Sequence, residues 1–165
     1  MNAPAPEPAE SYLLLRSRIL RLNPGEMGLS PTNEAPHVWG VVMETGYEVG
    51  SATLVTLADG TTSLYISTGG GMLGSGEYLP VAKAAKTMVS QAENYLQQMS
   101  STTELPLPEV GQVRLTVLTY TGTFAAEAPE KKLSTGKHPL SPLYVCAQEI
   151  LSQLRTLSEK KPKLL

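Results

Sequence analysis

The residues with the clearest capacity for ligand chemistry lie in a glycine-rich stretch between a predicted strand and a predicted helix. The candidate ligand-binding residues are Gly69, Gly70, Gly71, Gly74, Ser75, Gly76 and Lys83. Glycine reaches backbone angles that are closed to other residues, and it lets a ligand or another backbone come close. Backbone N–H groups at a helix N-terminus also favour anions. Two hypotheses follow, a phosphate or nucleotide site and a tightly turned connection.

The spacing Gly69-x-Gly71-x-x-Gly74 formally matches the dinucleotide-binding pattern. That pattern requires a parallel strand–helix–strand unit whose helix opens within the motif. Here the preceding strands resemble a hairpin meander, and the helix is expected to begin only near Leu79. A phosphate loop would need a lysine directly after the last glycine, and none stands there. The pattern therefore favours a structural turn, with small-molecule binding as the alternative.

Residue types that usually serve catalysis or metal binding are scarce. The chain has one aspartate, Asp59, two histidines, His37 and His138, and one cysteine, Cys146. Asp59 precedes a glycine between two strand-like runs, a typical hairpin turn. We therefore expect no metal and no cofactor, and a non-catalytic protein. An enzyme built on glutamate and tyrosine, with Glu77 and Tyr78 as the first residues to test, stays open as a second alternative.

Composition limits the class of protein. The chain has 165 residues, 41% of them hydrophobic and 17% charged, with a net charge of −2. These values are typical of one globular domain and give no general reason to expect nucleic acid or a membrane as partner. A single cysteine and an N-terminus without a basic and an apolar region predict a cytoplasmic protein.

Periodicity predicts a single α+β domain over residues 11–158, between a disordered tail at 1–10 and a basic frayed tail at 159–165. We expect helices over 11–22, 79–99 and 141–157, and strands over 38–43, 52–57, 62–67, 113–120 and 123–126. Ser11 is expected to cap the first helix, and a turn around Gly46 is expected to follow the first strand. Arg16 should flank the apolar face of the first helix. Residues 129–139 are expected to form a basic loop.

The apolar stripes of the helices must cover faces of a mainly antiparallel sheet, which gives two or three layers. The resulting order, α-β-β-β-α-β-β-α, is similar to that of roadblock-type and profilin-like domains. Element order alone carries this likeness, so it is an analogy at the level of the fold. The resemblance implies a dimeric adaptor or regulatory platform.

Charge is unevenly distributed along the chain. No lysine or arginine occurs from Leu22 to Ala82, a stretch that includes all three strands of the predicted meander. Natural sheet edges are usually guarded by charge or proline, so this sheet should be covered by its own chain or by another subunit. Residues 37–128 carry a net charge of −5 and residues 129–165 a net charge of +4. This segregation fits either a basic helix lying on an acidic body or a contact between subunits. The sequence thus predicts a self-associating interaction or regulatory domain, with a homodimer as the expected state and another protein as a possible partner.

Overall fold

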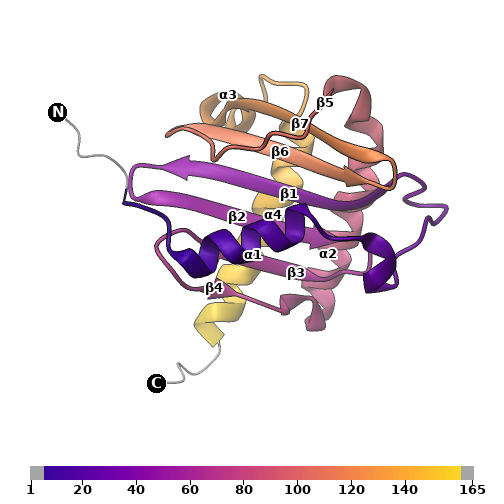
Figure 1. Ribbon diagram of the computed structural model, residues 1–165, viewed down its shortest axis with the longest axis horizontal. Coiled ribbons are helices and arrows are strands. Elements are labelled where there is room, and N and C mark those ends of the chain that lie inside the picture. The colour runs from indigo at the N-terminus through magenta and orange to yellow at the C-terminus, as the bar shows by residue number, and fades with distance from the viewer. Residues whose placement is uncertain (1–5, 161–165) are drawn as a thin grey trace.

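The chain folds around one antiparallel sheet with helices on both faces (Figure 1). The computed structural model describes residues 6–160. The sheet has seven strands in the order β4-β3-β2-β1-β6-β7-β5. The strands are β1 (Val38–Tyr47), β2 (Gly50–Leu57), β3 (Thr62–Ile66), β4 (Gly71–Met72), β5 (Ser100–Ser101), β6 (Gln112–Thr119) and β7 (Gly122–Pro129). The helices are α1 (Glu10–Leu20), α2 (Leu79–Ala92), α3 (Glu130–Ser134) and α4 (Ser141–Lys160), with short 3-10 turns η1 (Pro24–Met27), η2 (Ser75–Glu77) and η3 (Glu93–Gln98). The predicted α+β class with three main helices is confirmed.

Strand β1 is longer than the sequence predicts, and the difference brings a charged residue into the centre of the sheet. The prediction of a strand over 38–43 followed by a turn is wrong, because β1 continues to Tyr47. Within this extension Glu44 pairs with Thr53 of β2 on one side and with Arg114 of β6 on the other. A carboxylate therefore lies in the middle of the central strand.

Other element boundaries also differ from the predicted ones. Helix α2 ends at Ala92 and passes into η3, where a single helix to residue 99 was expected. The short helix α3 forms within the predicted basic loop. The N-cap of α1 is Ala9, which makes no side-chain cap, so the expected capping by Ser11 is wrong. Propensity fixes such boundaries poorly because tertiary packing decides the last turn of a helix.

One face of the sheet is covered by α2 and α4, whose apolar stripes are those the periodicity predicts. The buried stripe residues are Val81, Ala85, Met88 and Ala92 from α2 and Leu143, Ala147, Ile150 and Leu154 from α4. They pack against Val41, Met43, Leu115 and Val117 of the two central strands. This layer is almost wholly apolar, and burial of its area supplies much of the driving force for folding.

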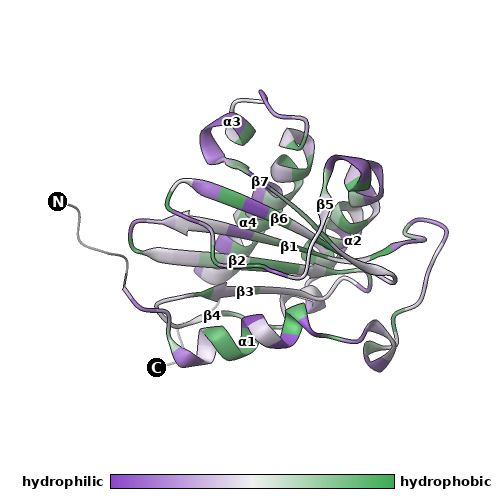
Figure 2. Cartoon of the chain, turned by 45° about the horizontal axis from the view of Figure 1, so that its top comes forward, coloured by the Kyte–Doolittle hydropathy of each residue, from purple (hydrophilic) through white to green (hydrophobic). Residues whose placement is uncertain are grey.

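Helix α1 lies on the opposite face, so the domain has three layers (Figures 1 and 2). Its residues Tyr12 and Ile19 are buried in a second cluster with Trp39 and Val42 of β1. The guanidinium of Arg16, a residue expected to flank the apolar face, reaches the buried Glu44, a contact that the sequence does not predict. The pairing of two opposite charges outweighs the preference of arginine for water.

The predicted tails lie partly outside the described residues. Residues 1–5 and 161–165 are not described, whereas Ala9 donates its N–H to the carbonyl oxygen of Ser67 at 2.7 Å. At the other end, α4 extends two residues into the predicted C-terminal tail, to Lys160. The described domain thus extends beyond the predicted range of residues 11–158 at both ends.

Candidate functional site

The glycine-rich stretch forms a tight connection at one edge of the sheet. Gly69, Gly70, Gly71 and Gly74 have φ values of 110°, 86°, 141° and 68°, a region that other residues rarely adopt. Gly71 belongs to β4, and a Cβ on it would lie 2.0 Å from the carbonyl oxygen of Leu64 in β3. The close approach of the two strands therefore requires glycine at position 71.

The turn η2 closes the rest of the same edge. A Cβ on Gly76 would lie 2.4 Å from the carbonyl oxygen of Gly60, so η2 packs directly against the turn between β2 and β3. Ser75 is buried there, and Thr62 at the start of β3 is fully buried. The border of the cation-free meander is thus covered by the glycine-rich stretch of the same chain.

The surroundings of the glycines differ from those of a dinucleotide-binding loop. The stretch follows an antiparallel meander, and its first turn leads into another antiparallel strand, β4. Helix α2 begins only at Leu79, so no helix opens within the glycine pattern. The N-terminal N–H groups of α2 therefore do not follow directly on the last glycine of the pattern, Gly74.

The predicted site residues lie at different hollows of the surface. Gly70 and Gly71 line a cavity of about 220 Å³ between α1 and the β3–β4 edge. Lys83 lines a separate groove of about 650 Å³ along α2, together with Lys86 and the buried Val89. The structure thus separates the predicted site residues, because Gly70 and Gly71 lie beside the end of β3, Gly76 lies beside the turn that precedes β3, and Lys83 lies at another surface.

Large apolar side chains are exposed in the segment that follows β4. Leu73, which follows β4, is 64% exposed, and Tyr78 and Leu79 at the start of α2 are 47% and 82% exposed. These three residues lie within seven positions of the chain but line three different hollows, Leu73 beside α1, Tyr78 between α2 and α4, and Leu79 along α2.

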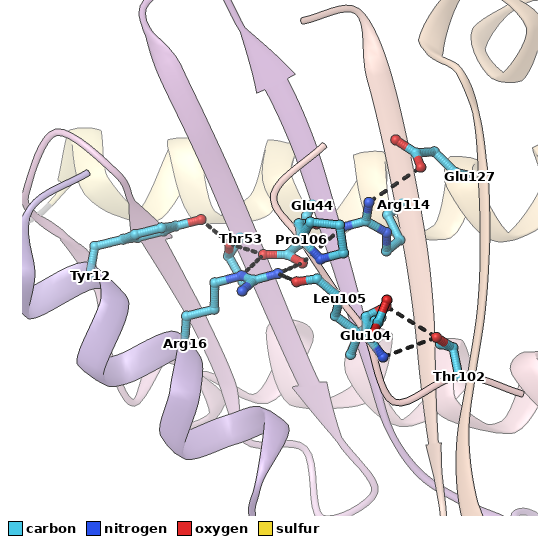
Figure 3. A network of polar contacts seen from close by, with 10 residues as sticks. All are labelled: Tyr12, Arg16, Glu44, Thr53, Thr102, Glu104, Leu105, Pro106, Arg114 and Glu127. Carbon is cyan, nitrogen blue, oxygen red and sulfur yellow. Dashed lines mark hydrogen bonds and ion pairs between the residues drawn. The ribbon is translucent and has the colours of Figure 1, made fainter. Parts of the chain in front are cut away.

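A buried polar cluster that no local sequence pattern indicates joins α1 to the sheet (Figure 3). Glu44 is fully buried and accepts two hydrogen bonds from Arg16, from Nε to Oε2 at 2.6 Å and from Nη2 to Oε1 at 2.9 Å. The Thr53 hydroxyl donates to Oε2 of the same carboxylate at 2.8 Å. The Tyr12 hydroxyl, 2.7 Å from that of Thr53, donates to it in turn. The hydrogen bonds of the Glu44 carboxylate thus come from side chains of α1 and β2.

A second arginine extends the cluster toward β7. Nη1 of Arg114 lies 4.0 Å from Oε1 of Glu44, and its Nη2 lies 3.3 Å from Oε2 of Glu127. Two guanidinium groups and two carboxylates therefore balance in charge. Burial lowers the pKa of Arg16, but its hydrogen bonds and charge interaction with Glu44 outweigh this and raise the pKa above its ordinary value. The cluster is a paired structural network, and each oxygen of the Glu44 carboxylate accepts at least one hydrogen bond within it.

Glu93 also has structural partners, and the single thiol is not activated. Glu93 accepts hydrogen bonds from the backbone N–H groups of His37 and Val38 at 2.6 and 2.8 Å, and its other carboxylate oxygen lies 3.0 Å from the His37 ring. Burial raises the pKa of the Cys146 thiol, which disfavours the nucleophilic thiolate. Within residues 6–160, no group of three His, Cys, Asp or Glu side chains could hold a metal ion.

Comparisons with known proteins add no relative. The chain matches no protein-family model, no curated protein and no solved structure. Over the part of the chain that the structure describes, none of the helices is both long and apolar enough to span a bilayer. Any proposal about function therefore rests on the geometry of this chain.

Proposed function

We propose that this chain is a non-catalytic interaction domain that self-associates through the β4 edge of its sheet. The observation that carries the proposal is the exposed edge strand β4, which is followed directly by the exposed Leu73 and, within seven positions, by the exposed Tyr78 and Leu79. Apolar surface next to unpaired strand backbone is a recurrent arrangement in contacts between proteins.

The backbone of β4 is available for pairing. Ile66 of β3 donates its N–H to the carbonyl oxygen of Gly70, so Gly70 faces β3. Because successive residues of a strand face opposite sides, the N–H and C=O of Gly71 point away from the sheet. Gly71 has no side chain to obstruct a second strand, and no charged residue lies between Gly69 and Gly76. An approaching strand could therefore extend the sheet at this position.

The rest of the meander supports this choice of surface. Its α1-side face is covered by α1, and the edge of β3 is covered by β4 and η2. The surface left for a partner on this side of the sheet is the outer edge of β4 with the adjoining Leu73. Two-fold pairing of one β4 edge with another would place Leu73 of each protomer close to its partner. A cytoplasmic location, expected from the single cysteine, stays a prediction.

Light scattering coupled to size-exclusion chromatography tests the proposal. We expect the wild-type chain to show twice its monomer mass of 17.7 kDa at tens of micromolar. The double variant Leu73→Ser/Leu79→Ser should weaken the dimer at least about tenfold, because burying one leucine contributes roughly 1.5–3 kcal/mol. Both side chains are exposed in the monomer, so its fold should be retained.

Val110→Ser is the matched control. Val110 is also exposed, but it bridges the end of β1, with β2 and β3 between it and β4. This variant should remain dimeric. A wild-type chain that stays monomeric at these concentrations, or a control that dissociates as readily as the double variant, would refute self-association at β4.

A further inference from the structure

A second covering segment lies beside α1 on the same face of the sheet. Residues 102–111, here called the strap, connect β5 to β6. Leu107 of the strap packs into the apolar cluster beneath α1. At the end of the strap, Gly111 donates its N–H to the carbonyl oxygen of Gly46 at 2.9 Å. Helix α1 and the strap therefore both cover this face.

Two arginines from different elements hold the strap. Arg16 of α1 donates to the carbonyl oxygen of Leu105, and Arg114 of β6 donates to that of Pro106 (Figure 3). The strap contains two prolines, Pro106 and Pro108, which have no N–H and cannot enter a regular strand ladder. Two consecutive carbonyl groups of the strap thus depend on guanidinium donors outside it.

Glu44 connects these two arginines. Its carboxylate accepts both hydrogen bonds of the Arg16 fork and lies 4.0 Å from a nitrogen of Arg114. The carboxylate is fully buried, whereas the side chains of Arg16 and Arg114 are 13% and 8% exposed. Loss of either cation would leave a buried charge with fewer partners and change the position of the other cation. The bonds that hold α1 and those that hold the strap are consequently interdependent.

We propose that α1 and the strap form a single releasable cover, coupled through Glu44, so that displacement of either one loosens the other. Opening this cover exposes an apolar region of the sheet that includes Trp39, Val42 and Leu118. This proposal does not rest on self-association at the β4 edge. Because coupling between two sites is reciprocal, it can be measured from both ends.

Hydrogen exchange of the backbone amides in the full chain tests the coupling. Arg16→Met removes the guanidinium from α1 but leaves the strap sequence unchanged. We expect the amides of Leu107 and Gly111 to exchange at least about tenfold faster, because a charged hydrogen bond that holds the strap is lost. In the reverse direction, Arg114→Met should accelerate exchange within α1 by a similar factor.

Arg18→Met is the matched control. It makes the same substitution, arginine to methionine, at an exposed position of the same helix. It should leave the strap at the wild-type rate, and the central β1 and β6 amides should stay protected in every variant. Arg16→Lys provides a milder variant that keeps the charge but loses the two-nitrogen fork, and it should still loosen the strap. Arg16 variants that change exchange only within α1, or Arg114→Met that changes it only within the strap, would overturn the proposal.

Discussion

The two faces of the central strand differ in one charged side chain, Glu44. Toward α2 and α4, β1 presents Val41 and Met43, which are buried among apolar residues. Toward α1 it presents Val42 and Glu44, and Glu44 is held by Arg16. The first face is closed by complementary apolar stripes alone, whereas the second combines an apolar cluster with a small number of directed polar contacts.

This difference predicts different responses to mutation. An apolar layer loses stability in proportion to the volume and area removed, and it tolerates exchanges of similar shape. A buried ion pair is sensitive to the loss of charge even when shape is kept, because the remaining charge stays desolvated. Near-isosteric substitutions on the two faces therefore distinguish the two mechanisms.

Glu44→Gln should have the largest effect, because it preserves size but removes the charge between two guanidinium groups. We expect a loss of roughly 3–5 kcal/mol in the free energy of unfolding, the range for breaking a buried ion pair. Urea denaturation measures it as a lower midpoint at constant slope.

Glu127→Gln is the control for this substitution. Glu127 contacts the same Arg114, but its side chain is 40% exposed. An exposed pair contributes less than about 1 kcal/mol, so this variant should remain close to the wild type. Equal losses for the two variants would mean that burial of Glu44 does not decide the stability of the α1-side face.

How much the sequence predicts also differs between the faces. The stripes of α2 and α4 were predicted correctly because a period of 3.6 residues is visible within each segment. Glu44 was assigned to a turn, since its partner Arg16 lies 28 positions away and no local pattern connects them. The two-residue strands β4 and β5 are equally invisible, because each exists only through pairing with a neighbour. The glycine-rich stretch was recognised as constrained, but whether it binds a ligand stays a prediction.

Alkaline pH should lower the free energy of unfolding through the phenol of Tyr144, which lies on the α2–α4 side of the sheet. Burial, together with the hydrogen bond from its hydroxyl to Glu130 at 3.0 Å, raises the pKa of Tyr144 well above its ordinary value of 10.0. The unfolded phenol ionises near pH 10 while the folded one keeps its proton. Stability is thus fully present below pH 10 and declines as the pH rises above it.

Tyr144→Phe removes this titrating group. The fall in unfolding free energy above pH 10 should become shallower by at most about 1.4 kcal/mol per pH unit, the effect of one proton. Denaturation series between about pH 9 and pH 11, roughly one pH unit either side of the free phenol's pKa, measure the slope. An unchanged alkaline slope would show that Tyr144 ionises equally in the folded and unfolded chain.

Ile150→Val should have the smallest effect and completes the comparison with Glu44→Gln. Ile150 lies fully buried on α4 among apolar neighbours, and the substitution removes a single methylene. The expected loss is about 0.5–1.5 kcal/mol, measured by urea denaturation under the same conditions. The two substitutions change side-chain shape little. The ratio of the two losses in unfolding free energy therefore compares stabilisation by a buried charge with stabilisation by apolar packing. A loss for Ile150→Val that equals the loss for Glu44→Gln would mean that packing limits the stability of both faces, and the contrast between them would then fail.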